Sequence, residues 1–433
     1  MVDIKIIIEN PEKIKEVIKN KGTTGITPED VDRLVELYTQ IKRLKTQLQE
    51  LNTKRNQLAK DKSMDAAQKR EMGKKLKQQI ADVQTKLERL EAEFNRIYTY
   101  VPGIYSDDTP IGPDEEYNKT VKEWGQKPAF DFTPKKHFEL MPALGLDTQR
   151  GAKVAGFRGY FLKGDLALLH WAVLTYAFLH VVGKGYMPVI PPTIAREFAL
   201  FGAGQFPWGR EDTFEIKNPH AKEPYFLIGT AEQSLMAMYA NETFEEQELP
   251  LKMVGFSPSY RREVGAHHKD LKGVVRVHEF WKVEQIVLAP PDKDLSYALH
   301  DEITKNAEEI LQALNLPYRV LAMCSGDMGQ PHYRKFDLEV WLPGSQRYRE
   351  THSSSIMGDF QARRNNIKMR TKDGKKVYVW SLNNTAIASP RILTAIVENY
   401  QNADGSITVP EVLRPYMLGK TRIEPVFDPK GRP

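Results

Sequence analysis

A heptad spacing of apolar residues in the first quarter of the chain most limits how this protein can fold. Leucine or isoleucine recurs at steps of 3, 4, 3, 4 and 3, and the polar stretch Asp61 to Asp65 separates this series from a second one. A repeat of this kind places one apolar seam on each helix, so the sequence predicts two helices paired as an antiparallel coiled coil. The two seams are Leu34, Leu37, Ile41, Leu44, Leu48, Leu51 and Leu58, and Leu76, Ile80, Val83, Leu87, Leu90, Phe94 and Ile97.

The first of these helices has a strong start signal. Thr27 is a candidate N-cap, Pro28 suits the first helical position, and the acidic Glu29 and Asp30 follow in the first turn. We therefore predict a coiled-coil hairpin over about residues 27–100. Each of its arms should be roughly 45 Å long at 1.5 Å per residue.

The basic surplus of the chain lies in this hairpin. Residues 31–100 contain 16 Lys/Arg and 10 Asp/Glu, whereas the whole chain of 433 residues has a net charge of +5. Two interpretations stay open at this point. The hairpin is an oligomerisation or spacer coil with a solvated charged face, or its cations attract a phosphate backbone.

Length and composition indicate two domains with a sizeable core, because 433 residues exceed one ordinary domain and 41% of them are apolar. A stretch rich in Pro, Gly and acids, residues 101–130, predicts a boundary between residues 1–105 and 106–433. The single Cys324 excludes an internal disulfide framework and fits a reducing compartment. We see no signal peptide and no apolar run long and uncharged enough to span a bilayer, so we expect a cytoplasmic protein without a membrane partner.

Beyond the boundary, strands mix with helices and long loops. This pattern favours an α+β fold, an antiparallel sheet with helices on one side, over a doubly wound fold. The sequence contains no GxGxxG or Walker loop, which removes the usual routes to nucleotide binding.

The segment from Ser259 to Glu284 reads as a strand, a long polar loop and a second strand that returns from Val274. It holds one guanidinium at each end of the loop, Arg261 and Arg276, with an aromatic ring nearby. Two fixed forks and a stacking surface suit an anionic, base-bearing ligand such as a nucleoside triphosphate. A surface hairpin kept soluble by its charges is the other interpretation.

A second segment near the C-terminus favours the nucleotide-binding interpretation of the hairpin over the surface hairpin. An apolar strand, Val377 to Leu382, precedes a short turn, and Ser389 and Pro390 then form an N-cap and first helical residue. Arg391 therefore lies in the first turn of a helix, where the helix dipole favours a phosphate. Upstream, an apolar helix and a glycine break lead into the strand and prolines that end at Pro192, an arrangement typical of an interface element.

Together these segments resemble motifs 1, 2 and 3 of class II aminoacyl-tRNA synthetases, at about residues 166–192, 255–285 and 377–401. The strings GTAEQSL from Gly229, FDLEVWLPGSQRYRE from Phe336 and GDFQARR from Gly358 are most similar to the seryl-tRNA synthetases of the common bacterial type. The resemblance covers essentially the whole chain. It implies an N-terminal antiparallel coiled-coil arm and a class II antiparallel β-sheet catalytic domain flanked by helices.

The resemblance also implies a function. It predicts a homodimeric ligase that forms seryl-adenylate and pyrophosphate from L-serine and ATP, and then esterifies the 3′ end of serine tRNA. Selenocysteine tRNA would share this route in an organism that has one. Two alternatives stay open: a class II relative that uses another small amino acid or a carrier acceptor, and a non-catalytic paralogue that binds tRNA.

Family motifs imply the site residues. Catalytic roles fall on Arg261, Glu350 and Arg391. ATP would be bound by Arg261, Glu263, Arg276, Val277, Phe280, Glu350, Ser353 and Arg391, with Phe280 and Arg391 on the two faces of adenine. Serine would be bound by Thr230, Glu232, Arg261, Glu284, Asn383 and Thr385. Mg²⁺ would be held by Glu350 and Ser353, and tRNA by Arg43, Lys54, Arg55, Lys74, Lys75 and Lys77.

The chain departs from the family pattern at a few positions. His352 stands where a small hydroxyl residue is usual, Arg262 replaces a small residue, and His267 and His268 change the loop chemistry. These departures bear on fine tuning more than on reaction type. Without the resemblance, Glu350 would be read as a salt-bridge partner of Arg347 or Arg349.

Overall fold

The computed structural model describes residues 1–61, 63–217, 219–220, 222–264 and 272–428. The chain divides into two compact units, Met1–Ile104 and Tyr105–Pro433. The predicted loop residues His267 and His268 lie outside the described residues.

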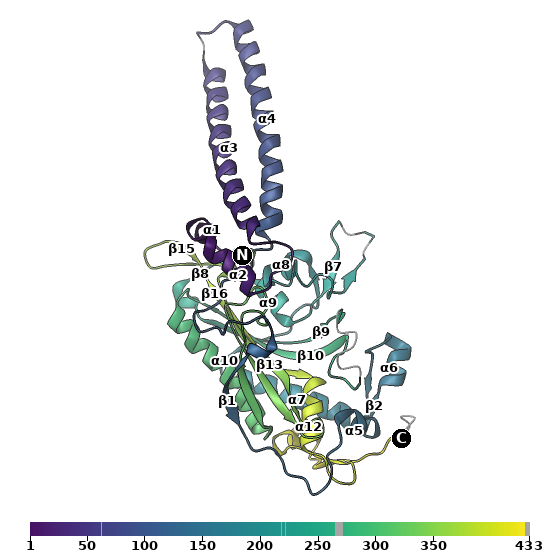
Figure 1. Ribbon diagram of the computed structural model, residues 1–433. Helices are drawn as coiled ribbons and strands as arrows, with labels where there is room; N and C mark the ends of the chain where they lie inside the picture. The colour runs from purple at the N-terminus through teal and green to yellow at the C-terminus, as the bar shows by residue number, and fades with distance from the viewer. Residues whose placement is uncertain (62, 218, 221, 265–271, 429–433) are drawn as a thin grey trace. The chain divides into compact units, whose positions relative to one another are not determined.

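In the first unit, two long helices run side by side as a hairpin (Figure 1). Asp65 caps the second helix by accepting from the backbone N–H groups of Ala67 and Gln68. The seam is best buried at the base, where Leu34 and Leu37 are fully buried, and it is only half-buried at Leu58 and Leu76. The antiparallel coiled coil is therefore confirmed. The helices are α1 (Ile4–Glu9), α2 (Pro11–Asn20), α3 (Glu29–Lys60) and α4 (Ala66–Tyr98).

Helix α3 begins one residue later than the sequence predicted. Pro28 occupies the cap position without a side-chain hydrogen bond, and Thr27 instead donates its backbone N–H to the carboxylate of Asp30 at 2.8 Å. A carboxylate of the acidic first turn thus accepts a hydrogen bond from a backbone N–H group just before the helix, as in a capping box. A one-residue shift at a helix end lies within the ordinary fraying of helix boundaries.

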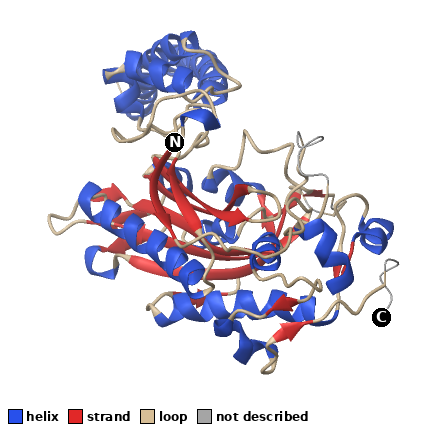
Figure 2. Cartoon of the chain, turned by 60° about the horizontal axis from the view of Figure 1, so that its bottom comes forward, coloured by secondary structure: helices blue, strands red, loops and turns tan. Residues whose placement is uncertain are grey.

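The described part of the second unit is built around a mostly antiparallel sheet of eight strands (Figure 2). Among the described strand pairs of this sheet, only the edge pair β4–β9 is parallel. In spatial order the strands are β1 (Lys119–Trp124), β11 (Tyr318–Ala322), β12 (Arg334–Leu342), β13 (Arg347–Gly358), β16 (Trp380–Ser389), β10 (Glu279–Ala289), β9 (Leu251–Tyr260) and β4 (Met187–Val189).

Long helices cover one face of this sheet and build the main core with it. They are α7 (Gly164–Gly183), α10 (Lys293–Ala313) and α12 (Arg391–Asn399). Two short helices, α9 (Ala231–Met238) and α11 (Phe360–Asn365), pack on part of the other face. The expected placement of helices on one side therefore holds for the long helices, and the rest of the second face is open for a site. The remaining helices are α5 (His137–Leu144), α6 (Thr148–Ala155) and α8 (Glu197–Ala203), with 3₁₀ turns η1 (Glu115–Tyr117), η2 (Glu246–Glu248) and η3 (Glu411–Met417).

Four small sheets complete the described part of the second unit. They pair β2 (Leu146–Asp147) with β3 (Phe161–Leu162), β17 (Ile407–Thr408) with β18 (Arg422–Ile423), β7 (Tyr225–Leu227) with β5 (Ile194–Arg196) and β6 (Glu215–Ile216), and β14 (Lys368–Arg370) with β8 (Thr243–Glu245) and β15 (Lys376–Tyr378).

Helix α7 corrects one expectation. Of the described helices, α7 alone is long and apolar enough to cross a membrane by length and composition, with a mean hydropathy of 1.7. The expectation that no apolar run could do so was therefore wrong. Leu166, Leu169 and Val173 are nevertheless fully buried in the main core, and α7 packs against β16 and η3. Such burial is what an apolar core helix requires.

Two predictions around β16 were also wrong. The strand predicted to stop at Leu382 runs without a turn to Ser389, and Pro390 rather than Ser389 occupies the cap position of α12. The hydroxyl of Ser389 lies instead 2.8 Å from the Nδ1 atom of His170. Pairing with β10 and β13 extends the strand through residues whose local sequence suggested a turn. The predicted position of Arg391, in the first turn of the helix, is confirmed.

Candidate active site

A cavity of about 330 Å³ opens on the sheet in the second unit, at the face that the long helices leave free. Strands β10, β13 and β16 form its floor, and the start of α9 and the first residue of α12 contribute to its rim. Most of the predicted serine- and ATP-binding residues line this one cavity. They are Thr230, Glu232, Arg261, Glu263, Val277, Phe280, Glu284, Glu350, Ser353, Asn383, Thr385 and Arg391.

Arg276 is the exception. It lines a neighbouring cavity of about 430 Å³, and its Nη1 atom lies 3.0 Å from the Oε2 atom of Glu263. The return strand begins only at Glu279, five residues after the predicted Val274, because the valines before it fold as a buried turn. Val275 and Val277 alternate with polar residues, which suggested a strand, but these valines belong to a turn packed on the core. The predicted phosphate contact of Arg276 stays a prediction.

A β-bulge explains how Glu350 and Ser353 reach the same cavity. An odd spacing along a strand normally puts two side chains on opposite faces. The β12–β13 register shifts so that Glu350 pairs with Glu339 and His352 with Leu338, which leaves Thr351 as an extra residue. Glu350 and Ser353 thereby line the cavity.

The unusual His352 does not line this cavity. It is buried, with its Nδ1 atom 2.7 Å from the hydroxyl oxygen of Thr351. Burial lowers the pKa of His352 to about 4, so its imidazole is neutral at ordinary pH. Its direct effect on a ligand is therefore smaller than its place in the sequence suggested.

A second bulge sets the positions of Asn383 and Thr385. Val283 pairs with Ile387 whereas Glu284 pairs with Thr385, so one residue of β16 is extra. The hydroxyl of Thr385 donates to the Oε2 atom of Glu284 at 3.2 Å. Both β16 residues lie in the middle of the strand, not at the strand end that the sequence suggested for Asn383.

Two carboxylates and an ammonium group form the first polar cluster of the cavity. Glu232 accepts hydrogen bonds from Gln361 at 2.6 Å and Asn383 at 2.9 Å. Desolvation and the nearby Glu284 raise the pKa of Glu232 to about 7. Lys282, which our sequence reasoning missed, lies 2.5 Å from Glu284. Strand alternation could have found it, because residues 280, 282 and 284 share one face.

The second polar cluster is cationic. The Arg391 guanidinium lies 3.3 Å from the carboxylate of Glu350 and donates to the carbonyl oxygens of Glu350 and Val275. Desolvation opposes ionisation of Glu350, but Arg391, Lys335 and Arg261 outweigh it and hold the pKa of Glu350 below its usual value. The partner of Glu350 is thus Arg391, not the Arg347 or Arg349 that its sequence neighbourhood suggested.

Arg261 lines the same cavity as both clusters. Its guanidinium carbon is 5.3 Å from the centre of the Phe280 ring, within range of a cation–π contact. Its charge lowers the pKa values of both Glu232 and Glu350, so it is within electrostatic reach of both clusters. A ligand with an ammonium group, a carboxylate and phosphates could contact all of these groups in turn.

The half-buried Lys335 and the buried Asp337, which both act on Glu350, were also missed by the sequence reasoning. Lys335 lies 3.1 Å from the Oδ2 atom of Asp337, and burial raises the pKa of Asp337 to about 6. The only sequence signal was their place before and within the FDLE string. Across the described residues, no group of three or more His, Cys, Asp or Glu side chains could hold a metal ion.

All six residues predicted to contact tRNA are exposed on the helical hairpin of the first unit, away from its apolar seam. They are Arg43, Lys54 and Arg55 on α3, and Lys74, Lys75 and Lys77 on α4. Exposure leaves their charges open to a polyanion.

Two family models match this chain. Residues 213–400 match the tRNA synthetase class II core domain (G, H, P, S and T), and residues 1–105 match the seryl-tRNA synthetase N-terminal domain. A serine–tRNA ligase from Deinococcus radiodurans is 39% identical over 97% of this chain and 98% of its own length.

Two solved structures are similar over nearly the whole chain. Seryl-tRNA synthetase from Pyrococcus horikoshii, complexed with ATP, has a TM-score of 0.90 at 35% identity and covers 98% of this chain and 100% of its own. The cytoplasmic serine–tRNA ligase from Naegleria fowleri, in complex with AMP, has a TM-score of 0.86 at 32% identity and covers 98% and 99%. The fold is therefore that of a class II aminoacyl-tRNA synthetase. Within this class, the chain belongs to the seryl-tRNA synthetase family.

Proposed function

We propose that this chain is a serine–tRNA ligase, which activates L-serine with ATP and then transfers the serine to the 3′ end of serine tRNA. One observation carries this proposal: Arg261 lines the same cavity as Glu232 and Glu350, and its charge acts on both of these carboxylates. An amino acid has an ammonium group that suits Glu232 and Glu284, while its carboxylate and the phosphates suit the guanidinium groups.

In the first step, the serine carboxylate attacks the α-phosphorus of ATP and pyrophosphate leaves. The carboxylate is already the nucleophile, so no protein base is needed. Arg261 aligns the carboxylate with the α-phosphate and stabilises the charge that develops between them. Arg391 supplies a second cation, and Phe280 offers the ring on which the adenine stacks. In the second step, a hydroxyl at the 3′ end of the tRNA attacks the adenylate carbonyl and AMP leaves.

Mg²⁺ fits the donor set of the cavity. Mg²⁺ at a nucleotide usually has one or two carboxylate ligands together with phosphates and water, so the pair Glu350 and Ser353 is sufficient. Asp337 contributes a further negative charge close by, and one of its carboxylate oxygens is buried without a hydrogen-bond partner among the described residues. When bound, the ion neutralises phosphate charge, while Arg391 and Lys335 hold Glu350 ionised.

Selection of serine follows from the Glu284–Thr385 contact. The serine hydroxyl can join this hydrogen-bonded pair, and an amino acid that lacks a hydroxyl would leave buried polar groups without a partner. Threonine adds only a methyl group, and a small pocket rejects it through size.

The first unit would bind tRNA through its exposed cations, mainly by contacts to the phosphate backbone. Functional boundaries at residues 1–105 and 106–433, a cytoplasmic location and the use of selenocysteine tRNA, where present, complete the proposal. A homodimer would form through the segment of α7 and β4. Exposed apolar side chains in this segment support the dimer: Trp171, Leu179, Met187 and Ile190.

Amino-acid-dependent ATP–pyrophosphate exchange with Mg²⁺ tests the proposal, with serine measured beside threonine, alanine, glycine and cysteine. Exchange with serine alone is the expected result. Exchange with another of these amino acids would keep the class and overturn the substrate. No exchange with any of them would favour a non-catalytic paralogue.

A further inference from the structure

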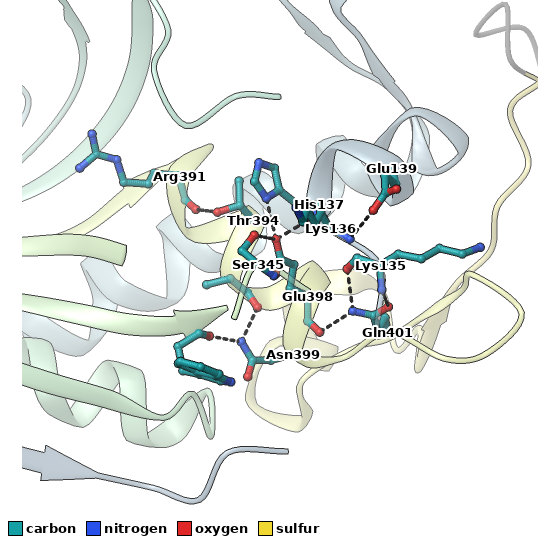
Figure 3. A network of polar contacts seen from close by, with 12 residues as sticks. Lys135, Lys136, His137, Glu139, Ser345, Arg391, Thr394, Glu398, Asn399 and Gln401 are labelled. Carbon is teal, nitrogen blue, oxygen red and sulfur yellow. Dashed lines mark hydrogen bonds and ion pairs between the residues drawn. The ribbon is translucent and has the colours of Figure 1, made fainter. Parts of the chain in front are cut away.

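A buried carboxylate lies at the far end of the helix that begins with Arg391 (Figure 3). Glu398 is fully buried and accepts from the backbone N–H of His137 at 3.0 Å, with the Nδ1 atom of His137 at 2.7 Å. Ser345 donates to the same carboxylate through its backbone N–H and its hydroxyl, both at 3.0 Å. Burial opposes ionisation, but the His137 hydrogen bonds outweigh it and hold the pKa of Glu398 below its usual value. None of these residues lines the candidate active site.

The His137 ring packs against the return segment of the motif 2 hairpin, residues 272–277. A Cβ atom built on Gly273 would lie 2.8 Å from the Cδ2 and Nε2 atoms of His137, so the backbone approaches this ring as closely as only glycine allows. The backbone of Gly273 also has φ of +78°, in the left-handed region. Two residues further on, the carbonyl oxygen of Val275 accepts from the Nε atom of Arg391.

Helix α12 therefore contacts the return segment from both of its ends. Arg391 at its N-terminus contacts Val275 directly, and Glu398 near its C-terminus contacts Gly273 through His137. The helix between them is packed along its length, because residues 392–398 are all buried. The segment held in this way supplies Val275 and Val277 to the cavity wall.

We propose that Glu398 and His137 are positioning residues for ATP: they set the distance between Arg391 and the return segment 272–277, and so the width of the nucleotide side of the cavity. This inference rests on the proposed function. A purely structural role would lower stability without changing the affinity for one substrate more than for the other. A positioning role raises KM for ATP and leaves KM for serine unchanged.

The first test changes the contact with the ring and not the carboxylate. Gly273→Ala places a methyl group against His137, and we expect KM for ATP in the exchange assay to rise between about tenfold and 10²-fold. Gly374→Ala is the matched control, since Gly374 has φ of +80° and nothing within 4 Å of the added Cβ. It should leave both KM values unchanged. An unchanged KM for ATP in Gly273→Ala would overturn the proposal.

A double-variant cycle separates the contact from backbone strain. His137→Ala removes the ring, and we expect KM for ATP to rise severalfold in this variant. In the His137→Ala background, the added effect of Gly273→Ala should be much smaller than in the unmodified chain. Strictly multiplicative effects would contradict a shared contact.

The carboxylate is tested by Glu398→Gln, which keeps the shape of the side chain but not its charge. We expect a severalfold higher KM for ATP and faster amide hydrogen exchange in residues 272–278. Amide hydrogen exchange does not depend on catalytic activity. It therefore tests whether Glu398 is coupled to residues 272–278 even if the unmodified chain shows no serine-dependent ATP–pyrophosphate exchange and the proposed function fails. If the amides of residues 272–278 exchange at the same rate in Glu398→Gln, His137→Ala and the unmodified chain, the coupling is absent.

Discussion

The helical hairpin of the first unit and the cavity of the second unit hold their charges in opposite ways. Lys75 and Glu71 on α4 form an ion pair whose side chains are 72% and 69% exposed. Lys282 and Glu284 in the cavity form a pair whose side chains are 7% and 3% exposed. Water and salt screen the exposed pair, so its ion-pair energy is small. The pair in the cavity is screened much less, so its charges interact more strongly.

This difference separates two kinds of recognition. Exposed cations on a long hairpin attract a polyanion through the sum of their electric fields. Loss of any one of them therefore lowers the affinity for the polyanion only slightly. Removing one partner of a buried pair leaves an uncompensated charge and costs about 3–5 kcal/mol. The hairpin is therefore suited to a large polyanion and the cavity to a small ligand with charges at defined positions.

The largest expected effect comes from shortening the hairpin. Replacing residues 46–85 with a short Gly/Ser turn cuts both helices at about the same height, because Lys45 pairs with Glu91 and Tyr38 packs near Phe94. We expect serine-dependent ATP–pyrophosphate exchange to persist and aminoacylation of serine tRNA to be lost. Aminoacylation at the rate of the full chain would show that the hairpin does not bind the tRNA.

Arg261→Ala, in the cavity of the second unit, should have the next largest effect. Loss of one preorganised cation should lower kcat/KM for ATP–pyrophosphate exchange by about 10²–10³-fold and leave tRNA binding intact, because the hairpin is unchanged. Arg262→Ala, at the exposed neighbouring position, is the control and should change the rate little. Activation at an undiminished rate in Arg261→Ala would remove Arg261 from the mechanism.

The pH dependence of serine use should sharpen the comparison further. Desolvation and Glu284 raise the pKa of Glu232 from its ordinary 4.5 to about 7. Below pH 7 the free enzyme therefore holds a protonated Glu232, which cannot pair with the serine ammonium group, so kcat/KM for serine should rise as pH increases through about 7. Glu232→Gln should give a lower kcat/KM for serine without this rise.

The same ionisation affects stability. Because the pKa of Glu232 is higher in the folded state, the free energy of unfolding of the unliganded protein falls as pH rises from 4.5 to about 7.

The smallest effects are expected from single cations of the hairpin. Changing Arg55 or Lys75 to Gln should raise KM for tRNA a few-fold and flatten the slope of log Kd against log salt by about 0.7–0.9 for each lost phosphate contact. Lys372→Gln, at a residue 90% exposed in the second unit, is the control. An unchanged salt slope after all six predicted cations are replaced would support the interpretation of the hairpin as a spacer.

Local pattern was enough for the hairpin and for the inventory of the site. The heptad seam and the polar stretch between its two series depend on residues three to seven apart, so the sequence contained all of the information. The resemblance to the family motifs supplied Phe280 and Glu284, and strand alternation would have added Lys282 on the same face. The family string from Phe336 supplied Glu350, and the motif 3 segment supplied Asn383 and Thr385.

Tertiary structure alone decided how these residues meet. The bulges at Thr351 and Ala386 reverse the side on which later residues lie, and they follow from pairing with distant strands rather than from local sequence. Ser389 became the end of a strand because its neighbours in the sheet extend the pairing, and Arg276 turned away because the valines around it were buried. The His137–Glu398 contact joins residues 261 positions apart. Periodicity reports only on the faces of one element, whereas register and long-range burial depend on the rest of the fold.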